Sequence, residues 1–365
     1  MGQDLTRLQE VFAKAKRGEQ LTIGFIGGSI TQGCHSAKPE YAYAYRVYEW
    51  LRQKFPDADL TYVNAGIGGT TSHFGAARVH EDLLVYQPDL VFLDFTVNDD
   101  ATDFFEETYE GVVRQILLSE KEPALVPVYH ICYQNGMNAE RVHAKICRHY
   151  KLPVVSMRPL YQRLLDGELE MEEITTDGLH PNDYGHKLVT DLIIEKLEAC
   201  MAEGRGNRRK DICGGDGITA NVEIPAPLTA NQYEHAVRYN NQNCLPQMEG
   251  FESDTCIPAD ITDCFAKGWT AKEDGAWITF SAECTELAVQ YRRSLKKAPK
   301  AKVILDGEET DLVLDGTFDE TWGDQLALTP VLTHGQKAVH TITLIVYDCE
   351  SAETDFMVVS FLLSR

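Results

Sequence analysis

The sequence predicts two regions of different fold class: a three-layer α/β/α sandwich on a parallel five-stranded sheet, followed by an all-β sandwich. Two observations support this prediction. Short apolar runs alternate with helical patterns over residues 21–200, which is typical of parallel βαβ units. Beyond residue 220 the helical patterns stop, and short β-branched and aromatic runs follow one another at close spacing.

The first twenty residues predict an amphipathic helix. Leu5, Leu8, Val11 and Phe12 fall on one side of this segment, among charged residues. The segment lacks the apolar core of a signal peptide. We therefore expect a cytoplasmic protein, unless a leader was removed before Met1.

Five apolar runs define the α/β region, with a helical pattern between or after them. The predicted strands are Leu21–Ile26, Leu60–Asn64, Leu90–Phe95, Ala124–Tyr129 and Val154–Ser156. The predicted helices are Tyr43–Phe55, Ser72–Tyr86, Phe104–Ser119, Ala139–Tyr150 and Tyr184–Cys200. Helices alternating with parallel strands cover both faces of the sheet, and we expect the first strand at its centre.

A glycine-rich segment at 201–220 breaks this pattern and predicts a linker between a first domain, 1–200, and a second, 221–365. The predicted strands of the second domain are Ala276–Ser281, Glu286–Tyr291, Ala301–Leu305, Asp311–Leu314, Leu326–Leu332, Val339–Tyr347 and Phe356–Leu363. Turn signals at Asp306-Gly307 and Asp315-Gly316 favour an antiparallel sandwich.

Composition excludes several classes of partner. The 365 residues include 34 basic and 56 acidic side chains, for a net charge of −22, which argues against nucleic acid and anionic membranes. No window approaches the roughly 20 apolar residues of a membrane helix.

The ten cysteines form no C-x-x-C pair, so neither a zinc site nor a disulfide framework is indicated. Cys34, five residues after Ser29, is more often an incidental loop residue than a catalytic one in such a position.

Ser29 follows the first predicted strand through two glycines, where the chain must turn sharply at the carboxyl end of the sheet. A serine at this place can be a nucleophile or only a helix cap. Gly69 and Asn98 follow the second and third strands and so reach the same edge of the sheet. A glycine N–H and an asparagine amide are suitable oxyanion donors because both donate without a charge, although each can also serve a turn or a cap.

Asp177 and His180 lie three residues apart, close enough for the carboxylate to orient the imidazole as a general base. A capping aspartate beside a surface histidine is the structural alternative. His35, His73 and His186 compete with His180 as the base, and the spacing to Asp177 favours His180.

The segments Gly27–Thr31, Asn64–Thr70, Val97–Asp99 and Asp177–His180 together resemble the four sequence blocks of the SGNH hydrolases, also called the GDSL esterase/lipase family. The resemblance covers about 22–196 and implies a flavodoxin-like SGNH fold. One departure is Gly28, where the family usually has Asp, and it affects the hydrogen bonding around the nucleophile loop.

This resemblance implies a site of five residues. Ser29, His180 and Asp177 would be the catalytic triad. The oxyanion hole would combine the Ser29 and Gly69 backbone N–H groups with the Asn98 amide. No metal and no other cofactor is needed for this chemistry.

The second domain resembles the jelly-roll modules of carbohydrate esterases. With the triad, it implies a serine esterase that removes acetyl groups from xylan-derived or related oligosaccharides through an acyl-enzyme. The alternatives are an SGNH lipase, thioesterase or lysophospholipase on longer acyl chains, and a catalytically idle carbohydrate-binding protein. Polar and small residues beside the motifs, such as Thr70-Thr71-Ser72, favour the short acyl group.

Three further expectations concern the surface. Trp269, Trp277 and Trp322 can form a sugar platform, although the alternating run around Trp277 favours the sandwich core for that residue, and Trp322 lies in a polar stretch that favours exposure. The sandwich can also be an assembly surface, from which we expect a homo-oligomer. The acidic cluster that begins at Asp99 predicts a solvated helix face; its members are Asp99, Asp100, Asp103, Glu106, Glu107 and Glu110.

Overall fold

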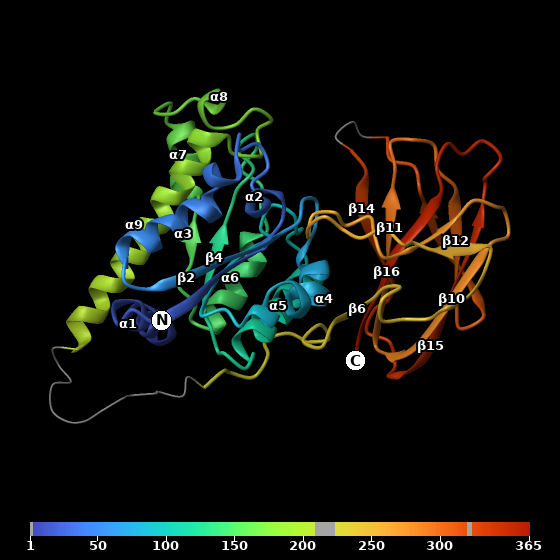
Figure 1. The fold of residues 1–365 in the computed structure, drawn as a ribbon, viewed down its shortest axis with the longest axis horizontal. Coiled ribbons are helices and arrows are strands. Elements are labelled where there is room, and N and C mark those ends of the chain that lie inside the picture. Colours follow the sequence, from blue (N-terminus) through green and yellow to red (C-terminus); the bar gives the residue numbers. More distant parts are fainter. Residues whose placement is uncertain (1–2, 209–222, 320–322) are drawn as a thin grey trace. The chain divides into compact units, whose positions relative to one another are not determined.

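A computed structural model describes residues 3–208, 223–319 and 323–365 of the chain (Figure 1). It divides into two compact units. The first comprises Met1–Gly75 and Val79–Asn231, and the second comprises Ala76–Arg78 and Gln232–Arg365. Most of the predicted linker, from residue 209 on, and Trp322 lie outside the described residues.

The first unit is built on a five-stranded parallel sheet with the order β2-β1-β3-β4-β5. Its strands are β1 (Gln20–Gly27), β2 (Asp59–Gly66), β3 (Leu90–Asp94), β4 (Ala124–Tyr129) and β5 (Val155–Ser156). All five correspond to predicted strands. The first strand is interior, but β3 and not β1 occupies the centre of the sheet.

Helices cover both faces of this sheet (Figure 1). The helices are α1 (Thr6–Lys16), α2 (Ser29–Gln32), α3 (Tyr43–Lys54), α4 (Ser72–Asp82), α5 (Asp103–Leu117), α6 (Glu140–His149), α7 (Arg158–Leu165), α8 (Met171–Ile174) and α9 (Asp183–Arg208), with 3-10 helices η1 (Pro39–Tyr41) and η2 (Leu84–Tyr86). Helices α1, α3 and α9 pack on one face, and α4, α5 and α6 lie on the other. The described part of the chain contains no helix that is long and apolar enough to cross a lipid bilayer.

Strands β1, β3 and β4 are mostly apolar, because both of their faces are buried. In β1, Ile23 and Phe25 point into the core beneath α1, α3 and α9. Gly24 points to the opposite face, where a Cβ would come within 2.6 Å of the Leu83 side chain. The absence of a side chain at this position therefore allows the chain after α4 to approach the sheet closely.

The last helix is longer than predicted. α9 continues to Arg208, past the predicted end at Cys200, so the first eight residues of the predicted linker are helical. The prediction ended the helix because of its glycines. Gly204 and Gly206 each cost only about 1 kcal/mol relative to alanine in a helix interior, which is too little to end a helix that already has several turns.

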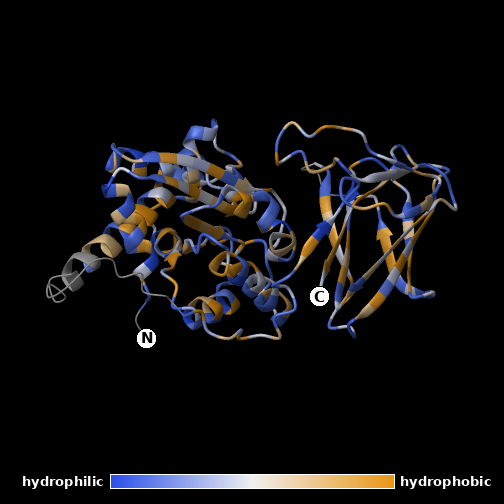
Figure 2. Ribbon diagram, turned by 60° about the horizontal axis from the view of Figure 1, so that its bottom comes forward, coloured by the Kyte–Doolittle hydropathy of each residue, from blue (hydrophilic) through white to orange (hydrophobic). Residues whose placement is uncertain are grey.

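The second unit is a sandwich of two antiparallel sheets, as predicted. One sheet has the order β13 (Glu308–Asp315), β12 (Lys300–Leu305), β15 (Ala338–Tyr347), β10 (Trp277–Cys284) and β7 (Gln247–Glu249). The other has the order β14 (Gln325–Leu332), β11 (Glu286–Arg293), β16 (Phe356–Ser364), β9 (Trp269–Ala271) and β8 (Phe251–Ser253), with β6 (Val237–Tyr239) paired to β16. Hydrophobic segments on these strands alternate with hydrophilic ones (Figure 2).

The structure corrects the expectations for two tryptophans. Trp269 is buried in the sandwich core, with its ring centroid 5.8 Å from that of Phe361, so it cannot contribute to a sugar platform. On β10, however, Ile278 and Phe280 face the core, and Trp277 lies half-buried on the opposite face. The prediction that Trp277 belongs to the core is wrong. In an alternating strand either set of alternate residues can face the core, and here Ile278 and Phe280 do so.

Candidate active site

Ser29 is the first residue of α2, directly beyond the carboxyl end of β1. Because β1 pairs in parallel with β2 and β3, Gly27 lies beside Gly66 and Asp94 at this edge of the sheet. The packing is tight: a Cβ on Gly66 would lie 2.2 Å from the Gln32 backbone nitrogen. The glycines therefore let the serine loop pass directly over the strand ends.

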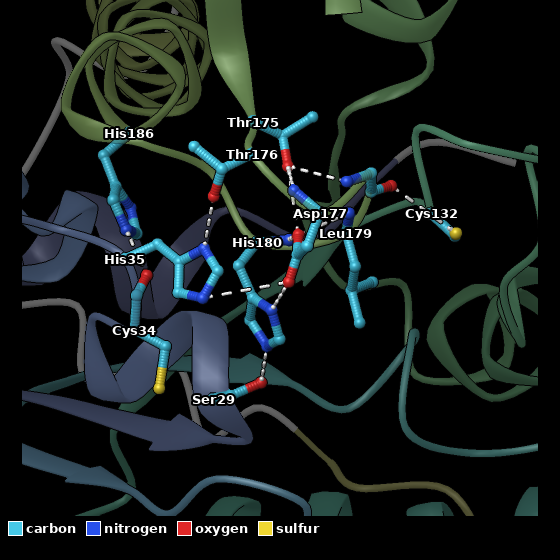
Figure 3. A network of polar contacts seen from close by, with 11 residues as sticks. Ser29, Cys34, His35, Cys132, Thr175, Thr176, Asp177, Leu179, His180 and His186 are labelled. Atoms are coloured by element: carbon cyan, nitrogen blue, oxygen red, sulfur yellow. Dashed lines mark hydrogen bonds and ion pairs between the residues drawn. The ribbon is translucent and has the colours of Figure 1, made fainter. Parts of the chain in front are cut away.

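The Ser29, His180 and Asp177 side chains form a continuous chain of polar contacts (Figure 3). Ser29 Oγ lies 2.7 Å from His180 Nε2, and His180 Nδ1 lies 2.6 Å from Asp177 Oδ2. The other carboxylate oxygen, Oδ1, accepts the backbone N–H groups of Leu179 at 2.9 Å and His180 at 2.8 Å. This arrangement has the geometry that a nucleophile, a general base and an orienting carboxylate require.

The same contacts keep Asp177 ionised. Partial burial acts to raise its pKa, but the hydrogen bond from the His180 ring and those from two backbone amides outweigh burial, so the pKa of Asp177 lies well below its usual range. A carboxylate that stays charged holds the Nδ1–H tautomer of His180. The Nε2 lone pair then faces the hydroxyl of Ser29.

The three predicted oxyanion donors occupy the same end of the sheet. Gly69, in the loop after β2, has a φ of +67°, and its backbone N–H donates no hydrogen bond within the described residues. The neighbouring Gly68 N–H is instead held by Gln32 Oε1 at 2.7 Å. Gln32 thus fixes the loop that presents Gly69, a positioning contact that the sequence analysis missed.

The position of the Asn98 side chain explains why residue 28 is a glycine in this chain. A Cβ at this position would lie 2.2 Å from Asn98 Oδ1 and 3.1 Å from Asn98 Nδ2. The Asn98 amide therefore occupies the space that a side chain at position 28 would need in this chain. The Asn98 Oδ1 atom is buried and has no hydrogen-bond partner among the described residues.

The competing histidines differ in their surroundings. Burial lowers the pKa of His73 and of His186 to about 4 in each case. His186 is also held by the Tyr43 backbone N–H at Nδ1 and by the Cys34 carbonyl at Nε2, each at 3.3 Å. His35 is exposed, and its ring centroid lies 4.9 Å from that of His180. Among the described residues, the histidine that contacts the serine hydroxyl is His180, whose Nε2 lies 2.7 Å from Ser29 Oγ.

Cys34 offers no competing nucleophile. Its thiol is partly buried, and burial together with the negative charge of Asp177 raises its pKa. A raised pKa lowers the fraction of reactive thiolate.

A buried polar network, which no sequence pattern predicted, lies beneath the loop that carries Ser29. Thr31 Oγ1 donates to Asp94 Oδ2 at 3.2 Å and lies 2.8 Å from the Tyr43 hydroxyl. Burial raises the pKa of Asp94 to about 7, although hydrogen bonds from Thr31 and Thr96 oppose that shift. The sequence signal for this network was Asp94, an acidic residue at the end of β3, whose other residues are apolar.

The acidic cluster after β3 is not a solvated face, contrary to the prediction. Asp100 and Asp103 are exposed, but Asp99, Glu106, Glu107 and Glu110 are buried. Asp99 Oδ1 accepts the Ser72 N–H at 2.8 Å, and Oδ2 lies 3.0 Å from the buried His143 Nε2. Hydrogen-bond partners that are distant in sequence, such as Ser72 and His143, allow these acidic side chains to be buried. The order of polar and apolar residues along the chain does not reveal such partners.

A model of the GDSL-like lipase/acylhydrolase family matches residues 25–188 of the chain. Among solved structures, a two-domain esterase (CEX) active on acetylated mannans is 45% identical, with a TM-score of 0.92 over 99% of this chain and 96% of that chain. A structure of a two-domain esterase (CEX) active on acetylated mannans, co-crystallised with mannopentaose, has a TM-score of 0.91 at 45% identity, over 100% and 95% of the two chains.

Two curated relatives match shorter stretches. Thioesterase 1/protease 1/lysophospholipase L1 of Escherichia coli (strain K12) is 28% identical over 147 residues, and acetylxylan esterase of Geobacillus stearothermophilus is 30% identical over 127 residues. These matches include 37% and 30% of this chain. The chain spans 66% of the first relative's length and 57% of the second's.

Proposed function

The chain belongs to the GDSL-like lipase/acylhydrolase family and is a carboxylic ester hydrolase, and from this premise we propose that it removes acetyl groups from acetylated oligosaccharides by a serine mechanism. The observation that carries the choice of substrate is the similarity over nearly the whole chain, sandwich included, to an esterase active on acetylated mannans. Manno-oligosaccharides are therefore the first substrates to compare with xylo-oligosaccharides.

In the proposed mechanism, Ser29 Oγ attacks the acetyl carbonyl carbon while His180 Nε2 takes its proton. Asp177 stabilises the imidazolium that forms. The Ser29 and Gly69 N–H groups and the Asn98 amide donate to the oxyanion. His180 then protonates the departing sugar oxygen, and the same residue activates a water molecule that releases acetate from Ser29.

Acetate release from acetylated manno-oligosaccharides tests this proposal directly. We expect faster turnover than with acetylated xylo-oligosaccharides of the same length, and a loss of at least about 10³-fold in the Ser29→Ala variant. A Ser29→Ala variant that retained wild-type turnover would overturn the serine mechanism. Equal rates on both sugars would remove the preference and leave the acetyl esterase activity.

A second candidate is an esterase or thioesterase for longer acyl chains, which the similarity to the Escherichia coli enzyme favours. Acetyl and octanoyl esters of the same alcohol separate the two. The proposal for acetyl groups requires a higher kcat/KM for the acetyl ester.

A catalytically idle binding protein is excluded if an organophosphonate labels Ser29 in the wild type and fails to label it in His180→Ala.

We also propose that the chain forms a homo-oligomer, with the sandwich as the assembly surface. Light scattering gives the mass in solution against the 41.0 kDa of one chain. A mass equal to one chain would reject this proposal without affecting the catalytic one.

A further inference from the structure

A second imidazole, that of His35, lies beside the Asp177 carboxylate and next to the His180 ring (Figure 3). His35 Nε2 is 3.8 Å from Asp177 Oδ2, the same oxygen that lies 2.6 Å from His180 Nδ1. One ligand atom from each of His35, Asp177 and His180 lies within 4.8 Å of the others. The three side chains are 40%, 37% and 20% exposed, so an ion can reach them from solvent.

We propose that His35, Asp177 and His180 form an inhibitory zinc site, in which Zn²⁺ binds His35 Nε2, Asp177 Oδ2 and His180 Nδ1. Zinc takes imidazole nitrogen at about 2.0–2.1 Å and carboxylate oxygen at about 2.0–2.2 Å, which puts tetrahedral ligand atoms about 3.3 Å apart. The two separations from Asp177 Oδ2, 2.6 Å to His180 and 3.8 Å to His35, lie on either side of this value, so binding requires rotation of the three side chains. Water would occupy the fourth position.

The surroundings of His35 suit a ligand. Thr176 Oγ1 lies 2.9 Å from His35 Nδ1 and can accept its N–H, which leaves the Nε2 lone pair directed toward the carboxylate. Metal-bound histidines usually donate their other ring N–H to an oxygen in this way. His35 also has a φ of +65°, a conformation uncommon for a residue with a side chain, so the loop holds this imidazole at a conformational cost.

Zinc at Nδ1 changes the tautomer of His180. The ring proton normally shared with Asp177 must then reside on Nε2, and Nε2–H donates to Ser29 Oγ instead of accepting its proton. The ion therefore removes the general base without filling the space in front of Ser29. This inhibition rests on the proposed role of His180, whereas binding of the ion does not.

Inhibition of the full-length enzyme by zinc chloride at neutral pH tests the proposal, with an aryl acetate as substrate. We expect kcat to fall while KM changes less than about twofold, and EDTA to restore activity. The variant His35→Asn keeps a residue that tolerates positive φ and loses the ligand. Its zinc inhibition constant, normalised to its own activity, should rise at least about tenfold.

His340→Asn is the matched control, because His340 also pairs with a carboxylate, Asp306 at 2.7 Å, but belongs to no three-ligand group in the described chain. It should be inhibited like the wild type. Magnesium chloride should not inhibit, since the site offers two nitrogen ligands. Equal inhibition of wild type and His35→Asn would overturn the proposed site. Inhibition through KM alone, or no inhibition by millimolar zinc, would overturn the inhibitory role of the ion.

Calorimetric zinc titration separates this proposal from the proposed function. Ser29→Ala should bind one zinc ion with wild-type affinity, and His35→Asn should lose that binding event. Binding that depends on His35 without any effect on kcat would retain the metal site and contradict the role of His180. Binding unaffected by His35→Asn would place the ion elsewhere and end the proposal.

Discussion

The loop that carries Ser29 depends on glycine at position 28, because the Asn98 amide fills the space where a side chain would start. A Cβ there would lie 2.2 Å from Asn98 Oδ1. We expect Gly28→Ala to displace the amide and lower kcat by about 10- to 100-fold. This loss should not exceed the loss expected when a proposed oxyanion donor is removed altogether. Steady-state kinetics with an aryl acetate measure the effect.

The double variant Gly28→Ala/Asn98→Ala shows whether the effect acts through the amide. If it does, Gly28→Ala costs almost nothing further once the Asn98 amide has been removed. Additive losses in the double variant would contradict this explanation and indicate damage to the loop itself.

The buried Asp94 carboxyl should make the protein less stable as the pH rises toward neutrality. Burial raises its pKa to about 7 from an ordinary value of 3.8, so the folded state favours the neutral carboxyl. Its contribution to the free energy of unfolding is complete below about pH 4 and is lost as the pH rises through about 7, by up to about 4 kcal/mol. Asp94→Asn removes this titration.

We therefore expect Asp94→Asn to be more stable than the wild type at pH 8, by a few kcal/mol, and nearly equal to it at pH 4. Thermal unfolding at both pH values measures the difference. Asp57→Asn, at an exposed aspartate, is the control and should show no such trend. A stability difference that does not vary with pH would show that Asp94 is ionised in the folded protein.

The sequence predicts which residues meet at the site better than it predicts what supports them. Ser29, Gly69 and Asn98 each follow a strand of one parallel sheet, so chain order alone brings them to a common edge. The Gln32 contact to the loop and the Asp94 network depend on side chains packed across separate strands and helices. No local pattern encodes such contacts, so only the structure reveals them.

At the scale of elements, α5 holds the chain that follows the linker. Glu110, fully buried on α5, accepts the backbone N–H groups of Leu228 at 2.6 Å and Thr229 at 2.7 Å. It also accepts the hydroxyls of Thr229 at 2.5 Å and Tyr150 at 2.6 Å. One turn later, Arg114 donates to the Pro225 carbonyl at 2.9 Å. These contacts tie the segment to the first unit.

Glu110→Gln should weaken this attachment. An amide replaces one acceptor oxygen with a donor, so at least one buried N–H or hydroxyl loses its partner. We expect a loss of about 2–4 kcal/mol in the free energy of unfolding, measured by urea denaturation. Glu198→Gln, which affects only an exposed ion pair with Lys54, should cost less than about 1 kcal/mol. Equal effects of the two variants would contradict a structural role for Glu110.

Elements with strong periodicity are predicted well, whereas several of the shorter elements are missed. β4 is observed with its predicted bounds, Ala124–Tyr129, because an apolar strand buried on both faces has a clear beginning and end. Helix α8 and strand β7 are missing from the prediction. Four residues in a helix or three in a strand carry too little periodicity, and tertiary contacts stabilise them instead.

At the scale of the whole molecule, the net charge of −22 bears on the choice among polysaccharides. Repulsion between a strongly anionic enzyme and an anionic polymer lowers the rate of encounter, and salt screens that repulsion over a Debye length of about 30 Å at 0.01 M and about 8 Å at 0.15 M. A neutral acetylated manno-oligosaccharide feels no such effect. The proposed substrate class is thus the one that the charge of the chain does not oppose.

We therefore expect kcat/KM on acetylated oligogalacturonides to rise severalfold between about 0.01 M and 0.15 M sodium chloride, because screening removes the repulsion. On neutral acetylated manno-oligosaccharides of equal length, kcat/KM should change by less than about twofold, which controls for any effect of salt on the enzyme itself. Acetate release measures both rates. A faster reaction with the acidic substrate at low salt would mean that a local cationic surface at the site outweighs the charge of the whole chain, and would redirect the search for the substrate toward acidic glycans.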